Sequence, residues 1–296
     1  MSQRNQTSPT ADVVAKKLFN DSEITKDFIE AFLGLKPKVV KILNGTLSDL
    51  RKERAERGKH FSTMVDVLAE LDDNTQVIIE IQVAQQDGFI KRLWTYSCQH
   101  LVKDLPNVRE KVERTHDMYD KIRPIYSIAL VESQYFVDSR PIHSFVISDE
   151  ETKDTLILPF GEEELLREPF RMTILELKKF QSEKLTSKQR FWFEFFANEE
   201  FSSDLPDVIK KAEDLLDREK WSEEEKEMFE NWQRQVSAHF GELKTAERQG
   251  AKKQALETAR NLIKNLGLAP EVVAENTGIT LEEALEIEES LTSSGV

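Results

Sequence analysis

The chain has 296 residues, of which 39% are hydrophobic and 32% charged, and its formal net charge is −14. This length allows an ample core in one large domain or two smaller ones. No apolar run approaches the ~20 residues that span a bilayer, and the excess of acid argues against a protein coated by nucleic acid over most of its surface.

The cysteine content and the first residues bear on the compartment. Cys98 is the single cysteine, so the chain can form neither an intramolecular disulfide nor a zinc cluster. Residues 1–10 are polar and are expected to be disordered, without the pattern of a signal peptide. We therefore expect a cytoplasmic protein with no membrane partner.

The first expected elements are a helix and a short strand. Ser22 followed by Glu23 predicts a capped amphipathic helix that ends at Gly34. Its apolar residues recur at helical spacing: Phe28, Ile29, Phe32 and Leu33. The segment 38–43 predicts a strand, and Asn44-Gly45 after it is a turn signal.

Two apolar segments that each contain a carboxylate come next. Residues 62–68 predict a strand with Asp66, and residues 77–83 predict a strand with Glu80 and, two positions later, Gln82. Asp72-Asp73-Asn74 between them suits a hairpin connection. Side chains two apart share a strand face, so Glu80 and Gln82 point one way while the odd-numbered residues can pack under a helix.

A buried carboxylate among β-branched residues is costly unless a cation or a proton compensates it. If the two strands are neighbours, Asp66 can approach Glu80 within the span of one cation. Mg²⁺ prefers carboxylate and carbonyl oxygens, so Asp66, Glu80 and the backbone carbonyl of Ile81 are the expected ligands, and Mn²⁺ can substitute. Such a metal lowers the pKa of a bound water.

The next elements complete an α/β core. Residues 89–103 have helical periodicity, with Trp94, Cys98 and Leu101 expected on one apolar side. Three strands follow, at residues 125–131, 143–148 and 171–177. The order helix, three strands, helix, strand predicts an α/β fold.

Beyond Phe180 the pattern is helical. Phe191, Trp192, Phe195 and Phe196 predict an aromatic helix face, and residues 221–240 and 246–266 predict two long helices. An apolar stripe on the second could pair with another subunit or within the chain.

The last segment, residues 268–291, outlines two short helices as in a helix-turn-helix. Its second helix is rich in glutamate, which disfavours DNA reading and favours protein contact or capping.

Taken together, these segments resemble the catalytic signature of the PD-(D/E)xK nuclease superfamily. More narrowly, the chain resembles the Rpn family of recombination-promoting nucleases, also called PD-(D/E)xK transposases. The stretches that carry the resemblance are Lys16–Phe19, Val65–Ala69, Ile79–Val83, Phe89–Arg92 with Tyr96, and Lys264–Leu268 with Asn276–Ile279.

This resemblance implies a restriction-endonuclease-like mixed sheet core of αβββαβ order, followed by an all-helical C-terminal extension. The nuclease-like domain would occupy residues 11–180, a helical region residues 181–245, and a long helix with the helix-turn-helix-like tail residues 246–296.

The resemblance also implies a function, a Mg²⁺-dependent DNA endonuclease of the recombination-promoting type. Asp66 and Glu80 would bind the metal, and Gln82 would orient the attacking water where the superfamily usually has a lysine. Because glutamine supplies no charge, Lys91 or Arg92 would have to stabilise the phosphate. Glu30 and Tyr96 are possible accessory residues.

Other functions stay open. The missing lysine, the acidic charge and the long helices also suit a degenerate nuclease fold that serves as an oligomerising interaction protein. In that case Asp66 and Glu80 could be solvated residues of an edge strand. A third possibility is a regulator that binds DNA through the tail. The basic residues before the aspartate strand are equally typical of a solvated loop. They are Arg51, Lys52, Arg54, Arg57 and Lys59.

Overall fold

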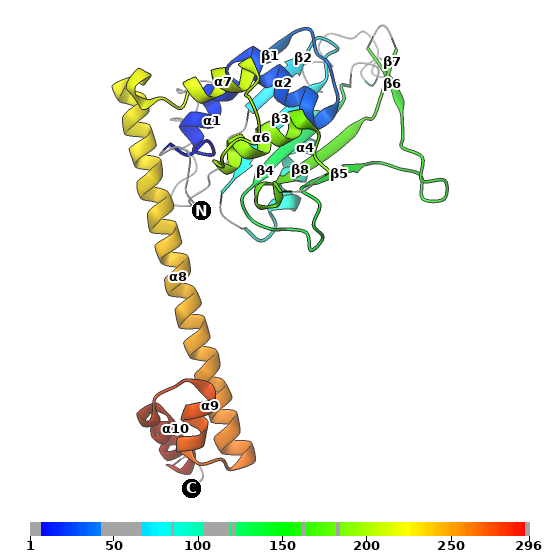
Figure 1. Cartoon of the computed structure of the whole chain (residues 1–296). Helices are drawn as coiled ribbons and strands as arrows, with labels where there is room; N and C mark the ends of the chain where they lie inside the picture. The colour runs from blue at the N-terminus through cyan, green and yellow to red at the C-terminus, as the bar shows by residue number, and fades with distance from the viewer. Residues whose placement is uncertain are drawn as a thin grey trace. The chain divides into compact units, whose positions relative to one another are not determined.

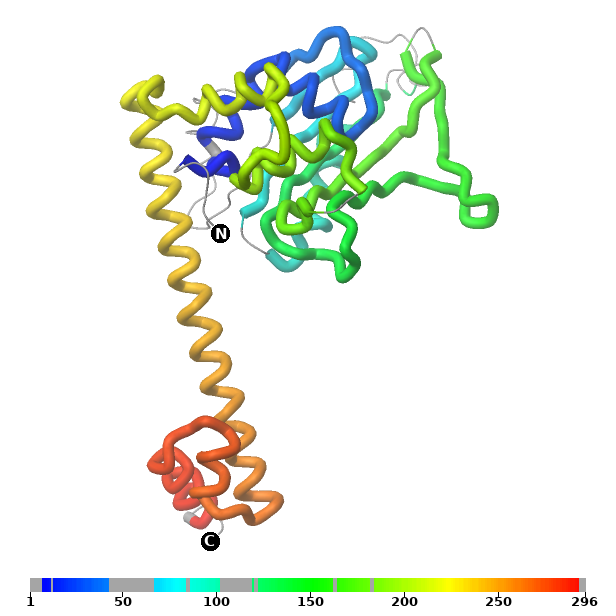
Figure 2. Tube along the Cα trace, viewed as in Figure 1, coloured from blue at the N-terminus to red at the C-terminus, as the bar shows by residue number. Residues whose placement is uncertain are grey.

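The computed structural model places most of the chain in two compact units, residues 1–232 and 233–296 (Figure 1). The residues it describes are 7–42, 67–83, 86–103, 119, 122–161, 164–181 and 184–293, and their path can be followed in Figure 2. Asp66 and the basic residues between Arg51 and Lys59 lie outside the described residues.

A six-stranded mixed sheet forms the centre of the first unit. Its order is β1-β2-β3-β4-β8-β5, in which β3, β4 and β8 are parallel and the outer pairings are antiparallel. The strands are β1 Val40–Ile42, β2 Val67–Leu71, β3 Gln76–Gln82, β4 Ile125–Val131, β5 Ile142–Val146 and β8 Phe170–Glu176. The predicted mixed α/β core is therefore confirmed.

The hairpin between β2 and β3 lies where the acidic turn predicts it. Asn74 has φ 62°, a left-handed conformation that asparagine tolerates better than most residues. A second, two-stranded hairpin was not predicted; it consists of β6 Leu158–Phe160 and β7 Leu165–Arg167.

An aromatic layer of helices covers one face of the sheet. Helices α1 Asp12–Phe19, α2 Ser22–Leu33, α6 Ser187–Ala197 and α7 Asp207–Asp214 belong to the first unit, with short 3₁₀ turns at Leu177–Lys179 and Arg218–Lys220. Phe28 on α2 makes edge contacts with Trp192 and Phe196 on α6, whose ring centroids lie 5.5 and 5.8 Å away. Arg171 on β8 donates a hydrogen bond to the carbonyl of Leu33, which places α2 on the face of the sheet that carries the odd-numbered residues of β3 and β8 (Figure 1).

Helix α4, Phe89–Lys103, packs against the other face. Phe89 and Leu93 form a buried cluster with residues of β4 and β8, namely Ala129, Val131, Met172 and Ile174. The predicted apolar side of this helix is wrong, because Trp94 is 58% exposed and Cys98 is also exposed. The helix begins at the predicted residue, but the neighbouring strands select the face of Phe89, Leu93 and Ser97 instead.

The second unit contains residues 233–266 of α8, with α9 Pro270–Thr277 and α10 Leu281–Ser293. Its core consists of Ala259, Ile263, Val273, Ile279 and Ala284. Helix α8 runs without a break over Glu223–Leu266, 44 residues, so the two long helices expected at 221–240 and 246–266 are one. The intervening residues contain no proline, and Gly241 and Gly250 are tolerated inside the helix.

Two further observations concern the N-terminus and membranes. Thr7 and Thr10 are buried, so the disorder expected over residues 1–10 does not extend to them. Among the described helices, none combines the length and the apolar character needed to cross a membrane.

Candidate functional site

Glu80 and Gln82 lie in the central strand of the sheet and are completely buried, as is every residue of β3. The sequence argument left one face of this strand open, but the structure covers both. Glu80 is in register with Ala129 on β4, and Gln82 with Val131, which places both side chains on the face that α4 covers. A buried carboxylate at this place requires compensation, as the sequence argument expects.

Arg92 on α4 connects this helix to the strand. Its Nη2 donates to Gln82 Oε1 at 2.7 Å, and its Nη1 donates to Gln86 Oε1 at 2.6 Å. The guanidinium also lies 5.5 Å from the ring centroid of Phe89. The side-chain oxygen of Gln82 is thus held by a cation ten residues further along the chain, and the orientation of its amide is fixed.

The contacts continue from Gln86 to the loop after β4. The backbone N–H of Gln86 donates to the Tyr135 hydroxyl at 3.2 Å, and burial raises the pKa of that hydroxyl. The backbone N–H groups of Tyr135 and Phe136 donate to Glu176 Oε1, at 2.6 and 3.1 Å. Glu176 ends β8 at the level of Val131 and Gln82, so this loop is anchored at the same edge of the sheet.

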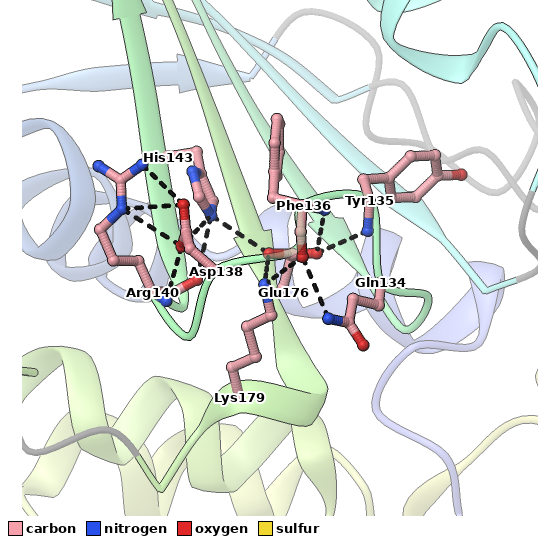
Figure 3. A network of polar contacts seen from close by, with 8 residues as sticks. All are labelled: Gln134, Tyr135, Phe136, Asp138, Arg140, His143, Glu176 and Lys179. Atoms are coloured by element: carbon pink, nitrogen blue, oxygen red, sulfur yellow. Dashed lines mark hydrogen bonds and ion pairs between the residues drawn. The ribbon is translucent and has the colours of Figure 1, made fainter.

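Figure 3 shows that Glu176 is the centre of a polar network, and its side chain is only 1% exposed. Its Oε2 accepts a hydrogen bond from Lys179 and lies 3.2 Å from His143 Nε2. The imidazole of His143 stacks on Phe136 with ring centroids 3.9 Å apart and lies 3.5 Å from Asp138. Hydrogen bonds from Arg140 lower the pKa of Asp138 to about 2. The network holds the loop that carries Tyr135.

The structure places the remaining predicted residues as follows. Ile81 is buried in β3, and Lys91 is exposed at the start of α4. Tyr96 is partly buried against the cluster of α4, β4 and β8. Glu30 forms ion pairs with Lys188 and Lys36, and the hydrogen bond from Lys188 lowers its pKa. Asp66 directly precedes Val67, the first residue of β2, and its position is not described.

The sequence argument did not single out Gln86, Tyr135, His143 or Glu176. The sequence does contain a feature that could have identified Glu176, because this carboxylate ends an apolar segment just as Glu80 interrupts one. The signal was ambiguous, since only the parallel register of β3, β4 and β8 shows that Glu176 and Gln82 end at one level.

The donor set near Glu80 agrees with a hard divalent cation but is incomplete in the described residues. These contain no group of three histidine, cysteine, aspartate or glutamate side chains suited to a metal. They supply one buried carboxylate, from Glu80, and the backbone carbonyl of Ile81, both oxygen donors.

The comparison with known families agrees with these features. The model of the PD-(D/E)XK nuclease family transposases matches residues 9–246, which cover the first unit and the beginning of the second. The stretches at 264–268 and 276–279 lie beyond this match. Neither a curated protein nor a solved structure matches the chain.

Proposed function

The chain belongs to the PD-(D/E)XK nuclease family transposases, and from this premise we propose that it is a Mg²⁺-dependent endonuclease of the recombination-promoting type. Its substrate would be DNA, and the reaction would be hydrolysis of a phosphodiester bond. Nucleases of this family generally use divalent metal ions, which agrees with the oxygen donors near Glu80.

One observation carries the proposal: a fully buried glutamate stands two residues before a glutamine whose amide is fixed by an arginine. Burial of a carboxylate in a central strand costs free energy, and a metal ligand placed there is held rigid. The β2–β3 register pairs Val67 with Ile79. In the sequence, Asp66 directly precedes Val67 and Glu80 directly follows Ile79. The proposal therefore includes Asp66 as the second carboxylate of the site.

Each residue has a proposed role. Asp66, Glu80 and the carbonyl of Ile81 would hold the metal. When bound, Mg²⁺ supplies charge stabilisation and a water of lowered pKa. Gln82 would orient that water through hydrogen bonds, and Arg92 keeps the Gln82 amide in one orientation. Lys91, exposed next to Arg92, would meet the phosphate. Glu30 is engaged by Lys188, and Tyr96 by packing, so neither has a proposed direct role.

The test compares plasmid nicking by the wild-type chain with nicking by Asp66→Asn and Glu80→Gln in Mg²⁺, Mn²⁺ or EDTA. We expect the wild type to nick only with metal, and each variant to lose at least about 100-fold of the rate, as for removal of one electrostatic catalytic group. Glu194→Gln is the matched control, because Glu194 is also buried but lies on α6. Equal nicking by all four proteins, or none in any metal, would refute the proposal.

A second candidate function is a degenerate nuclease fold that serves as an oligomerising interaction protein. Exposed apolar side chains in the second unit favour it, such as Leu266, Val272 and Leu285. Calorimetric titration with Mn²⁺ separates the two functions. A scaffold gives no heat that depends on Glu80, whereas the nuclease gives heat that the Glu80→Gln variant lacks.

A further inference from the structure

The outward face of α4 carries a large aromatic side chain that the packing of the helix does not use. Trp94 is 58% exposed, whereas Trp192, Trp221 and Trp232 are 1%, 5% and 6% exposed. These are the four tryptophans of the chain. An exposed tryptophan costs the hydration of a large apolar surface, so its position calls for a contact that the described residues do not supply.

The charge of α4 indicates what makes that contact. Its sequence contains Lys91, Arg92 and Lys103 and neither aspartate nor glutamate, in a chain whose net charge is −14. Every other α-helix with described bounds contains at least one acidic residue. A locally basic helix in an acidic protein is complementary to a polyanion and unfavourable for an acidic protein surface.

The exposed residues of α4 form one stripe. Lys91, Trp94, Thr95 and Cys98 are exposed and lie three, four and seven residues apart, which places them on one side of the helix. The opposite side is the buried one, with Phe89, Leu93 and Ser97. Arg92, next to Lys91 in this helix, is partly buried and donates a hydrogen bond to Gln82 of the candidate site.

We propose that Trp94 is a nucleic-acid-binding residue that stacks on an unpaired base while Lys91 meets a neighbouring phosphate. Every base has a π-face, so stacking on an exposed aromatic ring tolerates sequence, but it requires a base that is not already stacked in a duplex. The outward face of α4 would thus favour single-stranded over double-stranded DNA. This inference rests on the proposed function for the identity of the ligand and adds a specificity determinant to it.

The experiment measures binding without cleavage. The wild-type chain in EDTA is titrated with a fluorescein-labelled single-stranded oligonucleotide and with the duplex formed from it, and Kd is obtained from anisotropy. Trp94→Ala should raise Kd for the single strand about 10-fold or more, since stacking on one aromatic residue contributes that much, and should change Kd for the duplex far less. Trp94→Phe should stay within about 3-fold of the wild type, because it keeps a ring.

Intrinsic fluorescence gives a second, independent measurement with an unlabelled oligonucleotide. Because the other three tryptophans are buried, iodide should quench mainly Trp94, and a bound single strand should protect it from iodide. Phe145→Ala serves as the control, since Phe145 is exposed on β5 and should leave both measurements unchanged. Circular dichroism and urea unfolding verify that Trp94→Ala is folded.

The inference would be overturned if folded Trp94→Ala binds the single strand with an unchanged Kd. It would also be overturned if the Kd for the single strand and the Kd for the duplex increase by the same factor. Sedimentation showing a dimer that this variant dissociates without a change in DNA binding would overturn it as well, because a second copy would then cover Trp94. The proposed nuclease function is tested by a separate result, since absence of metal-dependent nicking would contradict that function alone. Protection of Trp94 by DNA in EDTA would still support the binding residue in that case.

Discussion

At the scale of single residues, the pair formed by Gln82 and Arg92 explains how the chain departs from the lysine typical of the superfamily. The amide oxygen of Gln82 accepts a hydrogen bond from Arg92 in a fully buried position. A lysine at position 82 would bring a second cation against Arg92 and would remove its acceptor. Gln82 and Arg92 therefore depend on each other, and the glutamine is more than the loss of a lysine.

This arrangement leads to a prediction about restoring the lysine. Gln82→Lys should lower the free energy of unfolding by about 2 kcal/mol or more, because a buried charged donor loses its acceptor and meets a like charge. It should not raise the cleavage rate. Urea unfolding and nicking assays measure the two effects. The double variant Gln82→Lys with Arg92→Gln should regain part of the stability, and a single variant as stable as the wild type would contradict the account.

Glu132 supplies a prediction on pH. Burial raises the pKa of its carboxyl above the ordinary value of 4.5, although a hydrogen bond from Thr10 opposes the shift. The Glu132 carboxyl therefore ionises at a lower pH in the unfolded chain than in the folded protein. As the pH rises from the pKa of the unfolded state to that of the folded state, this group lowers the free energy of unfolding. Glu132→Gln keeps the acceptor for Thr10 and removes the ionisation. The free energy of unfolding of this variant, relative to that of the wild type, should therefore increase from acidic to neutral pH.

The measurement is urea unfolding followed by circular dichroism across that pH range. Glu200→Gln is the control, because Glu200 is exposed and should give a difference that does not change with pH. If the difference in unfolding free energy between Glu132→Gln and the wild type is also constant with pH, ionisation of the buried Glu132 carboxyl does not cause a pH dependence of stability.

The residue scale also shows what the sequence could specify of the site. Glu80, Gln82 and Arg92 could be singled out because they lie in or beside strongly apolar segments with recognisable spacing, and their roles stay predictions. Gln86, Tyr135 and Glu176 join them through contacts that span up to 49 residues, and no local pattern encodes these contacts. Trp94 was misplaced for the same reason, since two helix faces were apolar and only the neighbouring strands select one.

At the scale of elements, the central strands β3, β4 and β8 were predicted closely, whereas the hairpin of β6 and β7 and the single long helix were not. The apolar runs that became β3, β4 and β8 are bounded by turns and prolines, so their ends are local properties. The sequence predicted two helices with a break between residues 240 and 246, whereas α8 continues through this segment and through Gly241 and Gly250. Isolated glycines weaken a helix without ending it, and no left-handed residue stands at either position.

The glycines of α8 give the prediction at this scale. A Cβ at Gly241 or Gly250 would meet nothing within 4 Å, so alanine fits at both. Gly241→Ala and Gly250→Ala should each raise helix stability by up to about 1 kcal/mol. Gly278→Ala should do the opposite, because Gly278 ends α9 at φ +74° although its surroundings are equally open. Helical ellipticity at 222 nm during thermal unfolding measures all three, and a stabilised Gly278→Ala would refute the conformational argument.

At the scale of the whole molecule, the two compact units have separate cores, and the family match ends at residue 246. The second core depends on few apolar side chains, of which Ile263 is one of the largest. Because each core stabilises its own unit, loss of one should open that unit by local unfolding and leave the other closed. The activity proposed for the first unit should then survive damage to the second.

Ile263→Ala tests this independence. The truncation should destabilise the second unit by about 2–4 kcal/mol, because it removes buried methyl groups and leaves a cavity. Hydrogen exchange followed by mass spectrometry should show faster exchange in α10 and unchanged exchange in β3, with metal-dependent nicking retained. Ile128→Ala, in the buried strand β4, is the reciprocal control and should accelerate exchange in the first unit, including β3, but not in α10. If Ile263→Ala accelerates exchange in both units, α8 couples their cores, and the second unit then contributes to the stability of the candidate site.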